Sequence, residues 1–360
     1  MRHPMLPFAQ AAYAWFLRPL MFRLDPERAH RITLAILAGI PAIAPVRDPP
    51  ELRTTLWGVT FSNPVGLAAG LDKDARAAAA WNALGFGFVE LGTVTPRPQF
   101  GNPRPRMWRI TERRALVNRL GFPSDGMEAV KPRIQRIRAQ GLRMRIGLNF
   151  GPNKETPPER VTEDYAALAS RLGPLADFIV VNLSSPNTPG LRAWQAPERM
   201  RTIVEAVRAS QAQNRRPLMV KLSPDLEERE LREICAAAID LALDGIVATN
   251  TTLKREEVGA SFEGGLSGEP LAKRAREVIA QIYRNTQGRL PIIGVGGIMS
   301  AEDGYAHIRA GASMIEFYTG FVYRGPGLVR EIKEGLVRLL SRDGFRSISE
   351  AVGSAKEKAT

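Results

Sequence analysis

The sequence predicts an α/β protein, a closed (β/α)8 barrel of the TIM type preceded by a small helical extension. Short apolar runs alternate with amphipathic stretches through most of the 360 residues. Eight such units over roughly 280 residues fit one barrel domain. A doubly wound open sheet is the alternative, but it needs fewer strands, and no Gly-x-Gly-x-x-Gly follows the first run. The closed barrel is therefore favoured.

The candidate strands are too uniformly apolar to alternate between a buried and a solvated face. Such runs are typical of parallel strands that helices cover on the outside. The eight strands are predicted at Asn63–Gly70, Phe88–Val94, Met144–Gly151, Phe178–Ser184, Leu218–Pro224, Gly245–Thr252, Pro291–Ile298 and Met314–Val322. Helices are predicted at Glu159–Leu172, Pro197–Gln213, Leu226–Leu243, Pro270–Asn285, Ala301–Ala310 and Pro326–Leu340.

Polar side chains cluster where the predicted strands end. Any one of them could cap a helix or bond a loop, but together they indicate a site on the C-terminal rim of the barrel. In strand order they are Lys73, Thr93, Asn149, Asn182 with Ser185, Lys221, Thr249 to Thr251, Gly296 with Gly297, and Tyr318 with Thr319.

The run Val180-Val-Asn-Leu-Ser-Ser-Pro-Asn-Thr-Pro-Gly190 is the most informative of these rim segments. Asn182 and Asn187 offer both donors and acceptors, which could read a cyclic amide or imide. Two prolines limit how far the loop can drift. Taken alone, the run also fits an ordinary turn-rich connection.

Strands seven and eight suggest a phosphate-bearing ligand. Ile293-Gly-Val-Gly-Gly-Ile298 precedes a helix, and Tyr318-Thr-Gly320 ends the last strand. Glycines let backbone N–H groups approach a phosphate, and loops after strands seven and eight are its usual position in these barrels. Glycines also serve tight turns, so the position in the barrel is what gives this motif its weight.

Composition narrows the chemistry. Cys235 lies in a predicted helix and is the single cysteine of the chain. One cysteine cannot form an intrachain disulfide or hold a cysteine-ligated cluster within this chain. The three histidines, at 3, 30 and 307, lie outside the rim motifs, so we expect neither a metal site nor histidine acid–base catalysis. The net charge of +13 suits anionic lipid or an anionic ligand, although arginine-rich coding bias is an equal explanation.

Residues 1–45 fall outside the predicted barrel, which occupies 46–345 and precedes a polar tail at 346–360. Met5–Leu24 is rich in apolar and aromatic residues, but Arg18 and Arg23 count against a membrane span. Asp25-Pro-Glu starts a second helix. A secretory signal is the alternative, and two amphipathic helices lying on a bilayer surface explain the pattern better.

Taken together, the motifs resemble the quinone-using class of dihydroorotate dehydrogenases over about residues 20–340. The Asn-x-Ser-Ser-Pro-Asn-Thr motif is the most specific. Phe122-Pro-Ser-Asp125 departs from the family, which more often has asparagines after this phenylalanine. The matching motifs are Gly66-Leu-Ala-Ala-Gly-Leu-Asp-Lys-Asp74, Glu90-Leu-Gly-Thr-Val-Thr-Pro-Arg-Pro98, Gly101-Asn-Pro-Arg-Pro-Arg106, Asn118-Arg-Leu-Gly-Phe122, Val181-Asn-Leu-Ser-Ser-Pro-Asn-Thr-Pro-Gly-Leu-Arg192, Thr249-Asn-Thr-Thr252, Gly264-Gly-Leu-Ser-Gly268, Ile293-Gly-Val-Gly-Gly297 and Tyr318-Thr-Gly-Phe321.

The resemblance implies oxidation of dihydroorotate to orotate in pyrimidine synthesis, with one FMN per chain as hydride acceptor and a membrane quinone as final acceptor. Ser185 would be the catalytic base, with Thr188 and a water beneath Phe122 as its proton relay. Lys221 would stabilise the negative charge of the reduced flavin.

The resemblance also implies three sets of binding residues. Substrate binding falls to Lys73, Asn118, Arg119, Leu120, Gly121, Phe122, Asn182, Asn187, Asn250 and Thr251. FMN binding falls to Ala69, Gly70, Leu71, Asp72, Lys73, Thr93, Asn149, Asn182, Lys221, Thr249, Gly268, Gly297, Tyr318 and Thr319. The quinone head would meet His30, Arg109 and Tyr318.

The expected partners are dihydroorotate and orotate, the quinone and a phospholipid surface. We expect a monomeric peripheral protein on the cytoplasmic face of the cell membrane, without a nucleic-acid partner. Three rival functions stay open. A flavin barrel that reduces uridine in transfer RNA would use a cysteine acid, and the soluble dihydroorotate dehydrogenase class would use a cysteine base and lack the N-terminal extension. A non-catalytic phosphate-binding barrel would carry no flavin.

Overall fold

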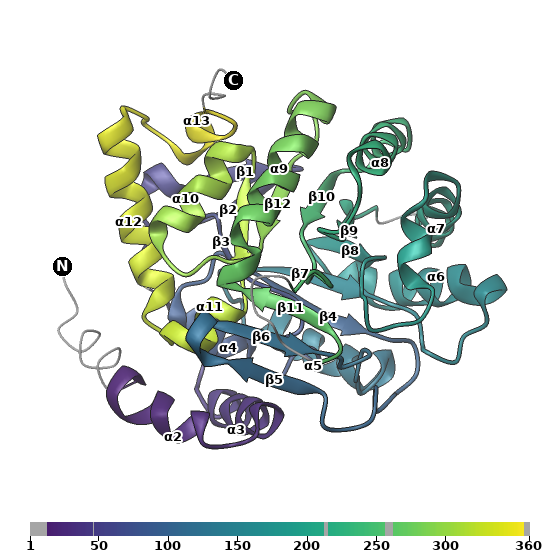
Figure 1. The fold of residues 1–360 in the computed structure, drawn as a ribbon, viewed down its shortest axis with the longest axis horizontal. Coiled ribbons are helices and arrows are strands. Elements are labelled where there is room, and N and C mark those ends of the chain that lie inside the picture. The colour runs from purple at the N-terminus through teal and green to yellow at the C-terminus, as the bar shows by residue number, and fades with distance from the viewer. Residues whose placement is uncertain (1–12, 46, 212–214, 256–261, 356–360) are drawn as a thin grey trace.

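The computed structural model describes residues 13–45, 47–211, 215–255 and 262–355, and its centre is a closed barrel of eight parallel strands (Figure 1). The barrel closes because β13 pairs with β3, Ile315 opposite Val65. Around the barrel the order is β10-β12-β13-β3-β4-β7-β8-β9. The strands are β3 (Val65–Leu67), β4 (Phe88–Val94), β7 (Arg145–Phe150), β8 (Phe178–Asn182), β9 (Leu218–Leu222), β10 (Gly245–Ala248), β12 (Ile292–Val295) and β13 (Met314–Phe317).

Helices cover the outside of the barrel, as Figure 1 shows for α6 to α10 and α12. Their buried faces are apolar, so the strands are apolar on both sides. The predicted (β/α)8 barrel is thereby confirmed. The covering helices are α4 (Ala78–Leu84), α5 (Met127–Ala139), α6 (Val161–Leu172), α7 (Pro197–Ser210), α8 (Glu228–Asp240), α9 (Ala272–Thr286), α10 (Ala301–Ala310) and α12 (Leu328–Asp343).

The eighth strand is shorter than predicted. It ends at Phe317, and the remaining apolar residues form the short helix α11 (Thr319–Arg324). An apolar run does not distinguish a strand from the first turn of a buried helix, and Phe321 is buried either way. The sixth strand likewise ends at Ala248 rather than at Thr252.

A short hairpin closes the N-terminal end of the barrel. It consists of β1 (Thr54–Leu56) and β2 (Val59–Phe61). Phe61 contacts Phe88 and Phe178 from the barrel interior, at ring-centroid distances of 5.9 and 6.4 Å. The indole N–H of Trp57 donates to the carbonyl of Asp244 at 2.6 Å. The lower barrel interior is therefore filled with apolar side chains.

A second small sheet lies at the opposite, C-terminal end. It is antiparallel, in the order β11-β6-β5. Its strands are β5 (Met107–Ile110), β6 (Ala115–Asn118) and β11 (Gly265–Gly268). β5 and β6 come after the second barrel strand and β11 after the sixth, so the sheet joins two loops distant in sequence.

The N-terminal unit begins with a π-helical turn (Tyr13–Leu17) and continues as α2 (Arg18–Phe22) and α3 (Pro26–Ala38). The predicted start of the second helix is confirmed, since the Asp25 side chain accepts from the Arg28 N–H at 2.9 Å. Residues 5–12 of the predicted first stretch, Met5–Leu24, lie outside the described residues. Within the described residues, no helix has the length and apolarity needed to cross a membrane.

A buried carboxylate attaches this unit to the barrel. Glu27 accepts hydrogen bonds from Arg106 at 2.7 and 2.9 Å and from Arg104 at 2.9 Å. Burial alone would raise the pKa of Glu27, but the hydrogen bonds from the two arginines outweigh it and lower the pKa to about 2. The contact therefore contributes stability above the usual glutamate pKa and loses it as the pH falls toward 2.

Further contacts hold α2 and the π-helical turn against the rim. The Tyr13 hydroxyl donates to the carbonyl of Val322 at 2.6 Å, and its ring lies where a side chain at Gly325 would stand. Arg109 donates to the carbonyls of Leu24 at 2.8 Å and Phe22 at 3.2 Å, at the end of α2. The unit therefore rests on β5 and on α11.

Part of the segment predicted as a polar tail is structured. Ile348–Ala351 forms the short helix α13, with Ile348 and Ala351 buried against the core. The apolar pair is too short to stand out in a lysine- and serine-rich stretch. Residues 356–360 lie outside the described residues.

We expect Glu27→Gln to loosen α3 without unfolding the barrel, because a neutral amide cannot satisfy two guanidinium groups. Hydrogen exchange of the α3 amides should accelerate on the order of 10- to 100-fold. Glu128→Gln is the matched control, since Glu128 pairs with Arg171 at 2.8 Å on the exposed surface. Equal α3 exchange in the two variants would contradict the anchoring role of Glu27.

Candidate functional site

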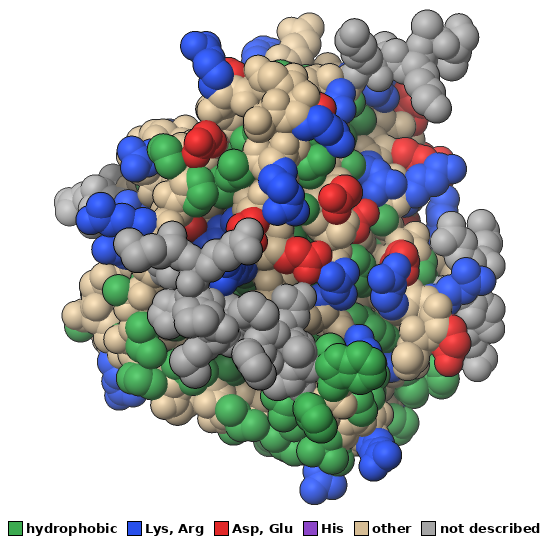
Figure 2. Space-filling view, turned by 90° about the vertical axis from the view of Figure 1, so that its left-hand side faces the viewer, with side chains coloured by type: hydrophobic (Ala, Val, Ile, Leu, Met, Phe, Trp, Pro, Cys, Tyr) green, Lys and Arg blue, Asp and Glu red, His purple; other side chains and the backbone are tan. Residues whose placement is uncertain are grey.

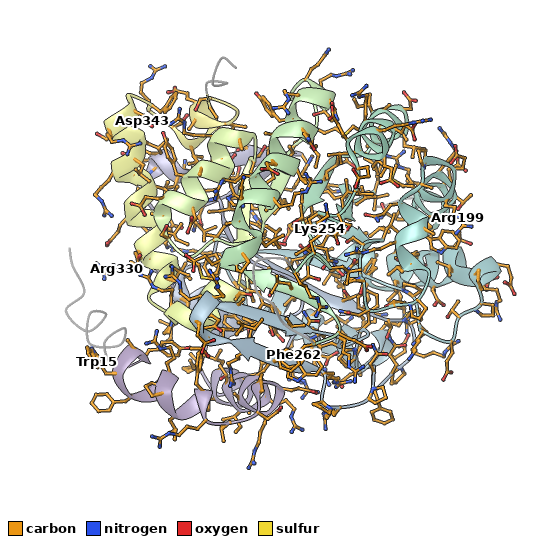
Figure 3. All side chains as sticks on the ribbon, in the orientation of Figure 1. Trp15, Arg199, Lys254, Phe262, Arg330 and Asp343 are labelled. Atoms are coloured by element: carbon orange, nitrogen blue, oxygen red, sulfur yellow. The ribbon has the colours of Figure 1, made fainter. Side chains whose placement is uncertain are left out.

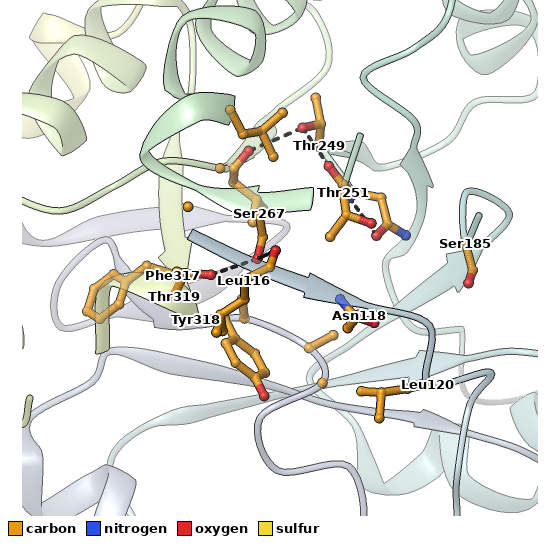
Figure 4. Close-up of a pocket in the computed structure, with 18 of the residues that line it drawn as sticks. Leu116, Asn118, Leu120, Ser185, Thr249, Thr251, Ser267, Phe317, Tyr318 and Thr319 are labelled. Carbon is orange, nitrogen blue, oxygen red and sulfur yellow. Dashed lines mark hydrogen bonds between the residues drawn. The ribbon is translucent and has the colours of Figure 1, made fainter. Parts of the chain in front are cut away.

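A cavity opens at the C-terminal ends of the barrel strands (Figure 4). Its walls come from the strand ends, the β5-β6-β11 sheet and the start of α11. Most of the predicted site residues line it. They are Ala69, Gly70, Lys73, Thr93, Asn118, Leu120, Gly121, Phe122, Asn182, Ser185, Asn187, Lys221, Thr249, Asn250, Thr251, Gly268, Gly297, Tyr318 and Thr319.

Seven predicted residues do not line this cavity. Asp72 is buried behind it and accepts from the Trp81 indole at 2.9 Å. The Arg119 guanidinium pairs with Glu263 on the exposed side. The Thr188 side chain is half-buried further along its loop. The other four are Leu71, Asn149, His30 and Arg109.

Asn182 is the centre of a buried amide network. Its side-chain N–H₂ donates to Thr93 Oγ1 at 3.1 Å and to Asn149 Oδ1 at 3.3 Å. Its Oδ1 accepts from the Asn250 amide, also at 3.3 Å. Asn149 therefore orients Asn182 from behind, and bonds of this kind hold the amide plane in one orientation.

Ser185 lies on the loop that follows β8, and its side chain faces the cavity (Figure 4). Its Oγ accepts the backbone N–H of Asn187 at 3.2 Å. The Asn187 side chain in turn donates to Asn118 Oδ1 at 3.3 Å, which connects the loop to β6. Ser185 and two amide side chains thus share one wall.

Arg192 fixes the far end of the same loop. It donates to the Ser184 carbonyl at 3.1 Å and to the Thr251 carbonyl at 3.0 Å, and it pairs with Asp225 at 2.8 Å. One side chain therefore joins the loops after β8, β9 and β10. The sequence motif contains Arg192, but its clamping role depends on loops that only the fold brings together.

Two lysines reach the cavity. Lys73 donates to the Gly70 carbonyl at 2.8 Å, and burial lowers its pKa to about 8. Lys221 donates to Glu90 at 3.2 Å and to Glu316 at 3.0 Å. Burial disfavours its charge, but the two carboxyl groups outweigh burial and raise the pKa of Lys221. Neither glutamate was predicted from the sequence to be a site residue.

The glycines after β12 have no room for side chains. Gly297 has a φ of +74°, and a Cβ there would lie 2.4 Å from the Cα of Ala272. Gly320, at the start of α11, would place a Cβ 2.2 Å from the Ile298 carbonyl oxygen. The backbone itself therefore forms this part of the cavity wall, as a phosphate site requires.

Other lining residues were not assigned a role from the sequence. Met107 and Leu116 come from the β5-β6 pair, and Ser267 Oγ lies 2.9 Å from Thr319 Oγ1. Leu271, Val295 and Phe317 add apolar surface. The Gly264–Gly268 motif indicated the loop that contains Ser267. The β5-β6 pair, which carries Met107 and Leu116, is an antiparallel insertion, and the strand–helix alternation of a barrel does not predict it.

A second hollow lies between the N-terminal unit and β5, and Met107 lines both cavities. Its wall includes Phe22, Trp108 and Arg109. His30 sits nearer the first cavity, where Nε2 contacts the Leu71 carbonyl at 2.6 Å and the ring centroid lies 6.2 Å from Tyr318. Burial lowers the pKa of His30 to about 4, which favours a neutral ring.

The fold and cavity define a (β/α)8 barrel with a candidate site at its C-terminal rim, which is the usual position of the active site in barrel enzymes. Comparison with known proteins identifies the family of barrel proteins to which the chain belongs. The family model of dihydroorotate dehydrogenase matches residues 51–340. The chain belongs to the dihydroorotate dehydrogenase family, and it is an oxidoreductase.

Curated relatives match over nearly their whole length. The dihydroorotate dehydrogenase (quinone) of Acidithiobacillus ferrooxidans is 49% identical over 94% of this chain and 98% of the relative. That of Mycobacterium tuberculosis is 46% identical over 95% and 98%. The crystal structure of DHODH from Eimeria tenella in complex with ferulenol superposes with a TM-score of 0.87 at 38% identity, covering 92% of this chain and 95% of that one.

We expect Gly297→Ala to lower the free energy of unfolding by more than the conformational cost of placing alanine at a positive φ. A Cβ at this position meets the Ala272 backbone, so the loop after β12 must move. Gly58→Ala is the matched control, because Gly58 has the same φ of +74° with nothing within 4 Å. The control should cost about 1–2 kcal/mol, and Gly297→Ala at least about 2 kcal/mol more. Equal unfolding free energies by denaturant titration would contradict a close-packed cradle.

Proposed function

We propose that this enzyme oxidises dihydroorotate to orotate with bound FMN and passes the electrons to a membrane quinone, as a step of pyrimidine synthesis. The observation that carries the proposal is the meeting of Ser185, the asparagine network and two lysines in one cavity with a glycine wall. The names of the near-full-length relatives support the quinone.

The cavity fits FMN on two counts, and a buried hydroxyl beside the FMN residues suits the substrate. The glycine wall after β12 and at the start of α11 suits its phosphate. Lys221 supplies a buried positive charge at the ring end. The Thr251 Oγ1 is buried without a hydrogen-bond partner among the described residues, as expected of a group that a bound molecule satisfies. Ala69, Gly70, Thr93, Thr249 and Gly268 would complete the contacts.

Lys73 and the amides suit an anionic cyclic amide. The Lys73 ammonium would meet the substrate carboxylate, and an anion beside it would stabilise its charged form. Asn118, Asn187 and Asn250 would pair with the ring amides, together with Asn182 and Thr251. A site with buried amides rejects an analogue that leaves them unpaired.

Ser185 would take the proton from C5 of dihydroorotate. FMN, when bound, supplies the acceptor for the hydride from C6. A hydroxyl is a weak base, so its own proton must leave as the substrate proton arrives, and Thr188 further along the loop offers a route past Phe122. The backbone N–H of Asn187 holds Ser185 Oγ in place and favours negative charge on it.

Cys235 argues against the transfer-RNA alternative. It is buried in α8, away from the cavity residues, and burial raises the pKa of its thiol to about 11. Such a thiol is not placed to act as the acid of a uridine-reducing barrel. The extension at 1–45 and the serine at 185 likewise favour the quinone-using class over the soluble one.

The N-terminal unit would lie on the cytoplasmic membrane surface. Figure 2 shows hydrophobic side chains gathered at the lower end of the molecule, and Figure 3 shows Trp15 pointing away from the body. Trp15 and Phe16 are 77% and 76% exposed, and Leu17, Leu20, Ile36 and Ile43 are also exposed. A monomer with such a patch needs a partner surface, and a bilayer fits it.

The quinone would enter between this unit and the barrel. The second hollow beside Arg109 shares Met107 with the main cavity, and Tyr318 with His30 forms the neighbouring wall. The Arg109 guanidinium already donates to the Leu24 carbonyl just after α2, and its Cζ lies 4.7 Å from the centroid of the Phe22 ring. Arg109 would therefore fix the shape of the entrance and present its charge to a quinone carbonyl.

We expect Ser185→Ala to slow flavin reduction by dihydroorotate on the order of 10²- to 10⁴-fold in stopped-flow absorbance, because the base is lost. Orotate affinity should change little. Ser184→Ala is the control, since the Ser184 hydroxyl bonds Asn182 and Asn250 instead of facing the cavity. It should weaken binding and slow reduction less than about tenfold. A purified chain without flavin, or an unchanged Ser185→Ala rate at neutral pH, would refute the proposal.

We expect the double substitution Trp15→Ser with Phe16→Ser to weaken binding to anionic phospholipid vesicles by at least about tenfold, because two large apolar contacts are lost. Reduction of a long-chain quinone in the vesicles should fall with it, while dihydroorotate still bleaches the flavin. Phe100→Ser is the control, since Phe100 is 96% exposed outside the N-terminal unit. Equal vesicle binding by the two variants would contradict this membrane face.

A further inference from the structure

Three ionisable side chains meet inside the barrel beneath the cavity. Glu90 comes from β4, Lys221 from β9 and Glu316 from β13. The ammonium nitrogen lies 3.2 Å from Glu90 Oε1 and 3.0 Å from Glu316 Oε1. The two glutamate side chains are fully buried, and the lysine side chain is 6% exposed. We call these residues the interior triad.

The triad is not neutral if all three groups ionise. Two carboxylates and one ammonium leave a net charge of −1 in the barrel interior. Among the described residues, the charged groups that act on Glu316 are Glu90 and Lys221. Glu90 gains further support from the Asn149 side chain, which donates to its Oε1 at 2.5 Å. Glu316 Oε2, in contrast, is buried and receives no hydrogen bond from the described residues.

An oxygen that lacks a donor can itself be the donor. Glu90 and Glu316 are close neighbours, because an oxygen of each lies within 3.2 Å of the same Lys221 nitrogen. Two carboxylates this close repel each other when both are ionised, and a proton on one of them removes that repulsion. We propose that Glu316 is a carboxylic acid at neutral pH, with a proton on Oε2 donated toward Glu90, so that the triad holds one ammonium, one carboxylate and one acid.

Burial, followed by the neighbouring Glu90, raises the pKa of Glu316 well above its usual value. The arrangement has a consequence for the site that rests on the proposed function. Lys221 keeps its full charge and a fixed position at the cavity, and no uncompensated negative charge lies beneath the ligand that accepts the hydride. Glu316 is a positioning residue that acts through Lys221.

Infrared spectroscopy of protein labelled with [δ-¹³C]glutamate tests the proposal directly, with or without flavin. At pH 7 the holoenzyme should show one isotope-shifted carboxylic-acid C=O band, which Glu316→Gln removes completely. Glu90→Gln should also remove it, since a single remaining carboxyl paired with Lys221 ionises. Glu128→Gln, at the exposed pair with Arg171, should keep it.

The pH dependence of unfolding gives a second readout. Folded Glu316 retains a proton that the unfolded chain releases above the ordinary glutamate pKa. Stability should therefore fall with rising pH in the wild type relative to Glu316→Gln, by up to about tenfold in the unfolding equilibrium constant per pH unit between pH 5 and the raised pKa.

Absence of the acid band in the wild type, its survival in Glu316→Gln, or equal pH slopes would overturn the proposal. Failure of Glu316→Gln to fold would do so as well, because an amide keeps the shape and can donate to Glu90. A protein that lacks flavin or does not oxidise dihydroorotate would refute the proposed function, yet the band would still report on the triad.

Discussion

Closure of the parallel barrel is the constraint on which the rest of the structure depends. Eight strands running in one direction, with β13 paired back to β3, must all end on the same face. Side chains as distant in sequence as Lys73 and Thr319 therefore share one cavity. The loops then need only short-range bonds, such as those of Arg192, to fix their relative positions. An open sheet would have left two edges and a split site.

A continuous set of hydrogen bonds connects the N-terminal unit to the reacting loop. Glu27 on α3 holds Arg106, and Arg106 donates to the Asn102 carbonyl at 2.8 Å. The Asn102 amide then donates to the Asn187 carbonyl at 3.2 Å, two residues from Ser185. The helices that would face lipid and the loop that would take the proton thus share one rigid frame. Each member of this set is at least partly buried.

The sequence allowed the barrel, its rim and most cavity residues to be predicted, because uniform apolar runs and the polar residues after them are local signals. It could not show the hairpin at Trp57, whose two strands have three residues each, or the β5-β6-β11 sheet, in which β11 pairs with β6 from a distant part of the chain. Glu90 and Glu316 were missed for a related reason. Each is one charged residue within an apolar strand, and only barrel geometry places it opposite Lys221. Asn149 accepts from Asn182 and does not itself line the cavity. Its position at a strand end could not tell a residue that lines the cavity from one that supports such a residue.

The barrel interior changes from apolar to charged within two residues along β4, β9 and β13. Phe88, Met219 and Met314 belong to the apolar cluster that the hairpin closes from below. Two positions further on, at the same period that returns a side chain to the same face, stand Glu90, Lys221 and Glu316. No solvent reaches these groups from the apolar layer beneath, so their charges must be balanced among themselves or from the cavity above. The apolar cluster is therefore the reason why the protonation state of the triad matters. If water reached the interior from below, both carboxyl groups could stay ionised. Lys221 would then present a weaker positive charge to a ligand bound above it.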